Sequence, residues 1–234
     1  LGGYLYIIAN DNDRMIYKYN ATTGVKDSQK NLSDQNMWDD LAGITNDGSV
    51  LLVHTKSSWN GIFTFDPDDS YERGDDYYPC CPSKNGARGF TYHSGREKYY
   101  AVNDGSVTIY NSEVQVEGES SFTEDSVSLE DTEGMTFGGD TLYIAHDISN
   151  DGKISKTFIP TNITSKPKGM AFSSSTSTPG EALWILVDGS PIDKLLKVDP
   201  STGLLINTFS SDGVVDAPSG DTEGITFLDT GDAT

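Results

Sequence analysis

The stretch Asp221-Thr-Glu-Gly-Ile-Thr-Phe227 contains a motif that recurs through the whole sequence. Each copy has a glycine, then a large hydrophobic residue, then Thr or Ala, and an aromatic residue closes four of the copies. The copies lie 35 to 55 residues apart, a spacing that fits the four-stranded blades of a repeat protein. The glycines of the five copies are Gly43, Gly89, Gly134, Gly169 and Gly224.

Two further kinds of segment accompany the motif. After each of the first four copies and a turn comes an apolar run of four or five residues, whose β-branched and aromatic content predicts a buried strand. These runs are residues 51–54, 98–102, 142–145 and 183–187. A third strand is expected at 61–66 and at 195–198, each with an Asp-Pro turn at its end. The sequence therefore predicts an all-β fold.

The last copy of the motif, at Gly224, has no second or third strand after it. Residues 5–9 and 15–20 match the missing strands and have no motif before them. We therefore predict a five-bladed β-propeller in a single domain, residues 1–234, with one blade shared between the N- and C-terminal segments. The expected blades are 221–234 plus 1–36, 37–82, 83–127, 128–165 and 166–220.

The shared blade leaves two alternatives open. The strand that runs from Gly224 to Leu228 can pair with the strand from Leu5 to Ala9 of its own chain, which closes the ring. It can also pair with that strand of another copy, or of the next unit in a tandem repeat, which predicts a head-to-tail filament. Because Leu1 lies inside an apolar strand, we interpret the sequence as a mature or excised segment.

Composition narrows the classes of partner. The chain has 36 acidic and 16 basic residues and a net charge of -20, which repels nucleic acid and anionic membrane surfaces. No apolar stretch is long enough to span a membrane. The acid excess is spread along the sequence, and it fits either a well-solvated surface or divalent cation binding.

Two features suggest an oxidising, extracellular location. The sequence has three N-glycosylation sequons, at Asn20, Asn31 and Asn162, so N-linked glycans are expected if the chain is secreted or presented at the cell surface. Cys80 and Cys81 are adjacent. They can form a strained vicinal disulfide, two bonds to another chain, or two free thiols, and the sequence leaves these alternatives open.

The blade pattern, Asp-Thr-Glu-Gly-Met/Ile-Thr-Phe followed by an apolar strand such as Leu142-Tyr-Ile-Ala-His-Asp147, resembles the propellers of the phytase-like, gluconolactonase (senescence-marker) and strictosidine-synthase-like group. The resemblance covers the whole chain as a periodic pattern. It implies Ca²⁺ on the propeller axis, held by a Glu before the motif glycine and by Asp or Asn at the end of the second strand. The residues that match these positions are Glu133, Glu223, Asn10, Asn103, Asp147 and Asp188.

The residues before the glycines depart from that pattern, because their charges alternate around the ring. Cations flanked by anions near the axis are expected to pair with one another, and a bound Ca²⁺ would be repelled by them. We therefore also predict an axial ring of salt bridges as an alternative to the metal site. Its members are Arg88, Glu133, Lys168 and Glu223.

A catalytic centre is not evident. The three histidines lie in different blades, and no motif for a nucleophile, a zinc hydrolase or a nucleotide site is found, so no catalytic residue is assigned. We expect an extracellular, glycosylated, non-catalytic propeller that acts as a structural, adhesive or assembly module. The alternative is a Ca²⁺-dependent hydrolase of lactones or phosphoesters that uses the axial rim.

Overall fold

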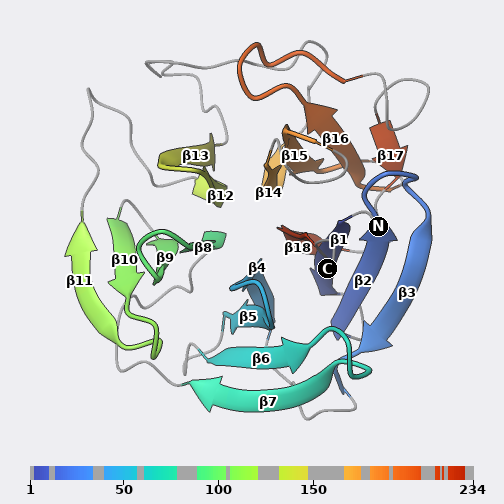
Figure 1. Ribbon diagram of the computed structural model, residues 1–234. Coiled ribbons are helices and arrows are strands. Elements are labelled where there is room, and N and C mark those ends of the chain that lie inside the picture. Colours follow the sequence, from blue (N-terminus) through green and yellow to red (C-terminus); the bar gives the residue numbers. More distant parts are fainter. Residues whose placement is uncertain are drawn as a thin grey trace, which may run out of the picture.

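The computed structural model describes residues 3–10, 14–33, 40–56, 61–77, 89–103, 106–120, 132–146, 166–174, 180–189, 192–206, 214–216, 218 and 221–229. Within these residues the strands form four four-stranded sheets and one two-stranded sheet. The sheets stand around a common axis like the blades of a disc (Figure 1). The chain is thus an all-β propeller, as the repeat predicts. Among the described residues, no helix is long and apolar enough to cross a membrane.

Three of the four-stranded sheets follow the chain in order, each as an antiparallel meander from the axis outward. One contains β4 (Leu41–Asn46), β5 (Leu51–Thr55), β6 (Ile62–Asp66) and β7 (Glu72–Tyr77). The next contains β8 (Gly89–His93), β9 (Lys98–Asn103), β10 (Ser106–Tyr110) and β11 (Val116–Ser120). The third contains β14 (Pro167–Ser173), β15 (Ala182–Val187), β16 (Lys194–Val198) and β17 (Val214–Asp216).

The other two sheets complete the ring. The two-stranded sheet contains β12 (Thr132–Gly138) and β13 (Thr141–His146). The remaining sheet has the order β18-β1-β2-β3 and contains β18 (Thr222–Leu228), β1 (Tyr4–Asn10), β2 (Arg14–Asn20) and β3 (Lys26–Asn31). Each described sheet falls within one of the blade ranges expected from the sequence.

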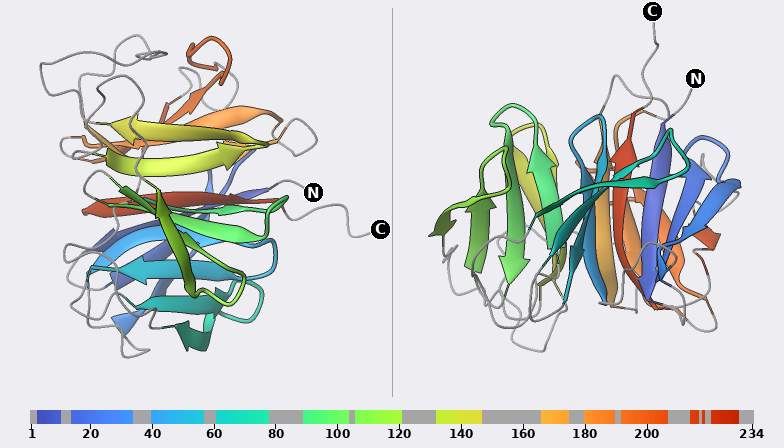
Figure 2. Two further views of the ribbon diagram at one scale, coloured as in Figure 1. Left: turned by 90° about the vertical axis from the view of Figure 1, so that its left-hand side faces the viewer. Right: turned by 90° about the horizontal axis from the view of Figure 1, so that it is seen from below.

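The blade shared by the two ends of the sequence is confirmed. β18 pairs antiparallel with β1, with Leu228 opposite Tyr4 and Ile225 opposite Ile7. In the structure this pairing lies within one chain; pairing with another copy stays a prediction. Figure 2 shows β18 and β1 side by side in the disc. We call the contact of β18 with β1 and with the neighbouring β4 the seam.

The five motif strands are the innermost strands (Figure 1). Their glycines approach the backbone of neighbouring inner strands around the axis. A Cβ placed on Gly134 would lie 2.7 Å from Cα of Gly169, and one on Gly169 would lie 3.0 Å from Cα of Gly224. A Cβ on Gly224 would lie 3.3 Å from Cα of Gly43. A residue with a side chain would push the neighbouring backbone away. The close packing of the inner strands is the physical reason for the glycine of the motif.

The hydrophobic core lies between neighbouring sheets. Leu5 and Ile7 of β1 belong to one buried cluster with Trp184 and Leu186 of β15. The other face of β1 contributes Tyr6 and Ile8 to a cluster with residues of the β4–β7 sheet. The outer strands β3 and β7 are polar and mostly exposed, which protects a sheet edge from pairing with other chains.

Candidate axial site

The residue before the motif glycine is a β-bulge. In the pairing of β18 with β1, Ile8 lies opposite Gly224 and Ala9 opposite Thr222, so Glu223 is an extra residue without a partner in the ladder. The register makes the same shift in β4, β12 and β14. A bulge re-aims a side chain away from the regular alternation. The bulged residues in these three strands are Ala42, Glu133 and Lys168.

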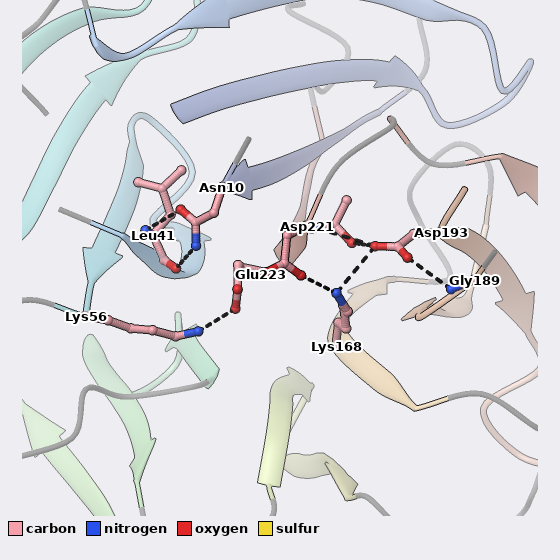
Figure 3. Close-up of polar contacts among 9 residues, drawn as sticks. Asn10, Leu41, Lys56, Lys168, Gly189, Asp193, Asp221 and Glu223 are labelled. Carbon is pink, nitrogen blue, oxygen red and sulfur yellow. Dashed lines mark hydrogen bonds and ion pairs between the residues drawn. The ribbon is translucent and has the colours of Figure 1, made fainter. Parts of the chain in front are cut away.

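The bulges stand at one end of a narrow axial cavity. The cavity has a volume of about 180 Å³. The five motif glycines and the hydrophobic residue after each glycine line this cavity, together with Glu223. The axis is therefore a closely packed passage, and its polar chemistry lies at the rim formed by the bulges (Figure 3).

Glu223 is held by residues from two neighbouring sheets. The ammonium of Lys56, just after β5, lies 2.6 Å from Oε2 of Glu223, and the two side chains are 31% and 17% exposed. Burial raises the pKa of Glu223, while the contacts with Lys56 and the amide of Asn10 oppose that rise without cancelling it. Asn10 also binds both backbone groups of Leu41, at 2.6 and 2.8 Å. Asn10 therefore links β1 to β4 as well as contacting Glu223.

Lys168 is held on the other side of β18. Its ammonium lies 2.5 Å from a carboxylate oxygen of Asp221 and 3.7 Å from Oδ2 of Asp193. Burial of Lys168 acts to lower its pKa, but the hydrogen bond to Asp221 and the charges of Asp193, Asp221 and Asp188 outweigh burial and raise the pKa. Lys168 therefore stays charged in a partly buried position.

Asp193 is a buried carboxylate that ties β18 to the β14–β17 sheet (Figure 3). It is 4% exposed. One oxygen accepts a hydrogen bond from the backbone N–H of Gly189 at 3.0 Å, and the other accepts one from the hydroxyl of Thr222 at the start of β18. Backbone and charge-assisted hydrogen bonds of this kind satisfy a buried carboxylate.

The expected ring of salt bridges takes a different form in the described residues. Lys168 pairs with Asp221 and Asp193, and Glu223 pairs with Lys56. Arg88 and the side chain of Glu133 lie outside the described residues, so their pairing stays a prediction. Sequence reasoning missed Lys56, Asp193 and Asp221 as partners. A signal existed for Asp221, because Asp-Thr-Glu-Gly occurs at both 131–134 and 221–224.

The predicted metal ligands are only partly brought together. Glu223 and Asn10 are in contact, whereas Asp188 lies close enough to Lys168 to influence its pKa. Asp147 and the side chain of Asn103 lie outside the described part. Among the residues that the structure describes, no group of three or more His, Cys, Asp or Glu side chains is placed to hold a metal ion. Ca²⁺ requires six to eight oxygen ligands, so the axial Ca²⁺ site stays a prediction.

The described sequons lie at turns. Oδ1 of Asn20 accepts hydrogen bonds from the backbone N–H groups of Thr22 and Thr23, both at 2.9 Å. Asp199 caps the equivalent turn of the β14–β17 sheet through the N–H groups of Ser201 and Thr202. Oδ1 of Asn31 accepts from the N–H of Ser33 at 2.8 Å. Asn162, Cys80 and Cys81 lie outside the described residues, so the third glycan and the cysteine chemistry stay predictions.

His54 does not reach the rim. It lies in β5 opposite Gly43 and is 2% exposed. Burial lowers its pKa to about 4, so the ring is neutral at physiological pH. His93 is also buried, with Nε2 3.3 Å from a carboxylate oxygen of Asp140. The side chain of His146 is not among those described.

Comparisons with known proteins identify no family for this chain. No family model matches the chain, and no curated protein matches it. A structure of U3-55K is 12% identical, with a TM-score of 0.49, over 97% of this chain and 83% of that one. A Bacteroides caccae protein of unknown function is 8% identical, with a TM-score of 0.49, over 97% and 99%. The WD40 repeats of RRP9 are 12% identical, with a TM-score of 0.49, over 97% and 82%.

Proposed function

We propose that this chain is an extracellular, N-glycosylated, non-catalytic propeller that serves as a structural or adhesive module. The observation that carries the proposal is the ion pairing at the axial rim. Glu223 and Lys168, which would supply the rim with chemistry, are each already bound to an opposite charge. A carboxylate that holds an ammonium group at 2.6 Å is poorly available to a metal or a substrate.

The rim contacts join sheets to one another. Lys56 connects the β4–β7 sheet to β18. Asp193 connects the β14–β17 sheet to Thr222 at the start of β18, and Lys168 connects that sheet to Asp221 just before it. These residues therefore stabilise the ring, which is the role expected of polar groups in a scaffold. The close approach of the motif glycines around the axis agrees with this role, because it leaves little space between the inner strands.

The sheet of β12 and β13 is proposed to be the inner half of a fifth blade, extending over residues 128–165. Its inner strand carries the same motif and the same bulge as β14 and β18. A propeller in which five inner strands meet at glycines requires a sheet at that place. The proposed glycans at Asn20 and Asn31 lie on the shared blade, at the ends of β2 and β3.

The extracellular role can be tested on protein isolated from its natural source. We expect mass spectrometry to find glycans at Asn20 or Asn31, removable by peptide N-glycosidase, and fractionation to place the protein outside the cell or on its surface. Unmodified protein recovered from inside the cell would overturn this part of the proposal. Ca²⁺ titration by calorimetry tests the non-catalytic part: we expect no heat of binding below the millimolar range.

A Ca²⁺-dependent hydrolase of lactones or phosphoesters, as the phytase-like resemblance implies, is the second candidate. Glu223 favours it, because a mostly buried carboxyl with a raised pKa is the kind of group that general acid catalysis uses. If this function holds, Ca²⁺ binds in the micromolar range and Glu223→Gln abolishes lactone or phosphoester hydrolysis. The same substitution in a scaffold changes stability alone.

A further inference from the structure

We propose that the ring can open at the seam between β18 and β1, and that β18 then completes the shared blade of a second copy of this chain, so that copies join head to tail. The proposal deepens the structural role proposed above by naming its partner. β18 and β1 are the last and the first strands of the described part, and no hairpin turn joins them. Their pairing therefore does not require that both strands belong to one chain. The same contacts can therefore form between two molecules at little cost in contact energy.

The contacts of β18 form two sets, and the boundary between these sets indicates where the ring opens. One set holds β18 to the sheet that precedes it in the chain. Asp193 binds Thr222, and Lys168 binds Asp221. Gly224 also packs against Gly169 of β14. These contacts keep β18 with the β14–β17 sheet of its own chain when the ring opens.

The other set crosses the seam. β18 pairs with β1 from Tyr4 to Ala9. Asn46 of β4 donates hydrogen bonds to the hydroxyl of Thr226 and to the carbonyl of Phe227, both at 2.8 Å. Lys56 binds Glu223. In an exchanged assembly, these contacts are made by the β1–β7 region of the next copy.

The seam also buries apolar side chains, and their exposure to water in an opened ring would be unfavourable. Leu5 and Ile7 of β1 pack with Trp184 and Leu186 of β15 and with Ile225 of β18. An opened ring would expose parts of this cluster at both edges of the opening. Exposed apolar surface drives association. The two edges are complementary and differ from each other. A second copy therefore satisfies them both, and the contact is a heterologous one that propagates.

A reversible cross-link tests the exchange. In a protein whose Cys80 and Cys81 are replaced by Ser, Tyr4→Cys and Leu228→Cys place two thiols opposite each other across the seam. Oxidation at micromolar concentration is expected to give a locked monomer. After reduction and incubation at millimolar concentration, we expect oligomers by light scattering, and after reoxidation a ladder of disulfide-linked species on a non-reducing gel. The locked monomer is expected to stay monomeric under the same conditions.

A matched control uses Tyr4→Cys with Asn20→Cys, which are opposite each other in the β1–β2 hairpin. This cross-link leaves the seam free, so the oxidised control is expected to form oligomers as the reduced seam variant does. The exchange is wrong if the reduced seam variant stays monomeric, or if its locked form assembles equally well through another surface. Because unglycosylated recombinant protein is used and no ligand is assayed, failure here is distinguishable from failure of the proposed function.

Discussion

At the scale of single residues, His54 occupies a position that is aliphatic in the other sheets. The residues that lie opposite the motif glycine elsewhere are Ile8, Val102, Ala145 and Leu186. His54 packs against Phe90, with ring centroids 5.8 Å apart, and Nδ1 is buried without a hydrogen-bond partner. A ring in this position is tolerated only in its neutral form.

We therefore predict that His54 makes stability depend on pH. The folded protein holds this pKa at about 4, while the unfolded chain titrates near 6.5. Between these values the unfolded state binds more protons, so the contribution is complete above about pH 6.5 and is lost as pH falls towards 4. The loss amounts to about 3 kcal/mol. Urea unfolding between pH 4 and 7 should show His54→Leu to be much less sensitive to acid than the natural protein. Equal slopes for the two proteins would refute this assignment.

Lys56 and Glu223 give a second prediction at this scale. Lys56→Met should destabilise the fold by about 1–3 kcal/mol at pH 7, because Glu223 is left charged and mostly buried. Burial already raises the pKa of this carboxyl, and loss of Lys56 raises it further. The fold then favours the protonated form, so the defect should shrink as pH falls towards that pKa.

The double variant Lys56→Met with Glu223→Gln provides the control for this pair. It should recover most of the stability at pH 7, and a double-mutant cycle measures the coupling. Additive losses would mean that the pair contributes nothing. The motif singled out Glu223 and Lys168 in the sequence. Sequence reasoning missed their partners, because Lys56 follows β5 and Asp193 precedes β16, both outside the motif, and only folding brings them to the rim.

At the scale of strands, the glycine ring predicts a graded series of substitutions. A Cβ at position 134 would meet backbone at 2.7 Å, at 169 at 3.0 Å and at 224 at 3.3 Å. We expect Gly134→Ala to cost the most, about 2–3 kcal/mol, with Gly169→Ala intermediate and Gly224→Ala the mildest. Thermal unfolding of the three variants gives the order. Gly118→Ala in β11 is the matched control, since no atom lies within 4 Å of its added Cβ, and it should be nearly neutral. A reversed order would contradict close packing at the axis.

Most strands could be predicted because the motif repeats five times and each copy has the same neighbours. The expected runs 51–54 and 183–187 became β5 and β15 with ends shifted by at most one residue. The bulge was not predicted. A bulge changes which residues face each other across two strands, but it leaves no mark in the hydrophobic pattern of the sequence. The bulge therefore becomes visible only in the register of the folded strands.

At the scale of the whole molecule, the described contacts that close the ring between β18 and β1 are strand pairing and side-chain packing. We predict that joining the two ends with a short peptide linker will raise the free energy of unfolding by about 3–5 kcal/mol, because the unfolded chain loses entropy when it is made circular. The linker can be short, because Leu228 lies opposite Tyr4. Urea unfolding of the cyclic protein measures the gain. The linear protein with the same added residues is the control, and equal stability of the two would contradict the prediction.

The sequence predicts that one blade is shared between its N- and C-terminal segments. It does not predict whether β18 pairs with β1 of its own chain or of another copy. The contacts of β18 are the same in one chain as between two, so the residues alone do not distinguish the two arrangements. Loop length and concentration decide between them.

At the axial rim, the motif glycine is required by the packing of the inner strands, whereas the identity of the bulged residue before it is not. The glycine touches the next inner strand and has no substitute, whereas the residue before it is extra to the ladder and already varies between Ala42, Lys168 and Glu223. In four of the inner strands the bulge thus presents a side chain that differs from strand to strand on the same backbone frame. New axial chemistry can arise by single substitutions at these places, so descendants of this scaffold can diverge in activity while their folds remain superimposable.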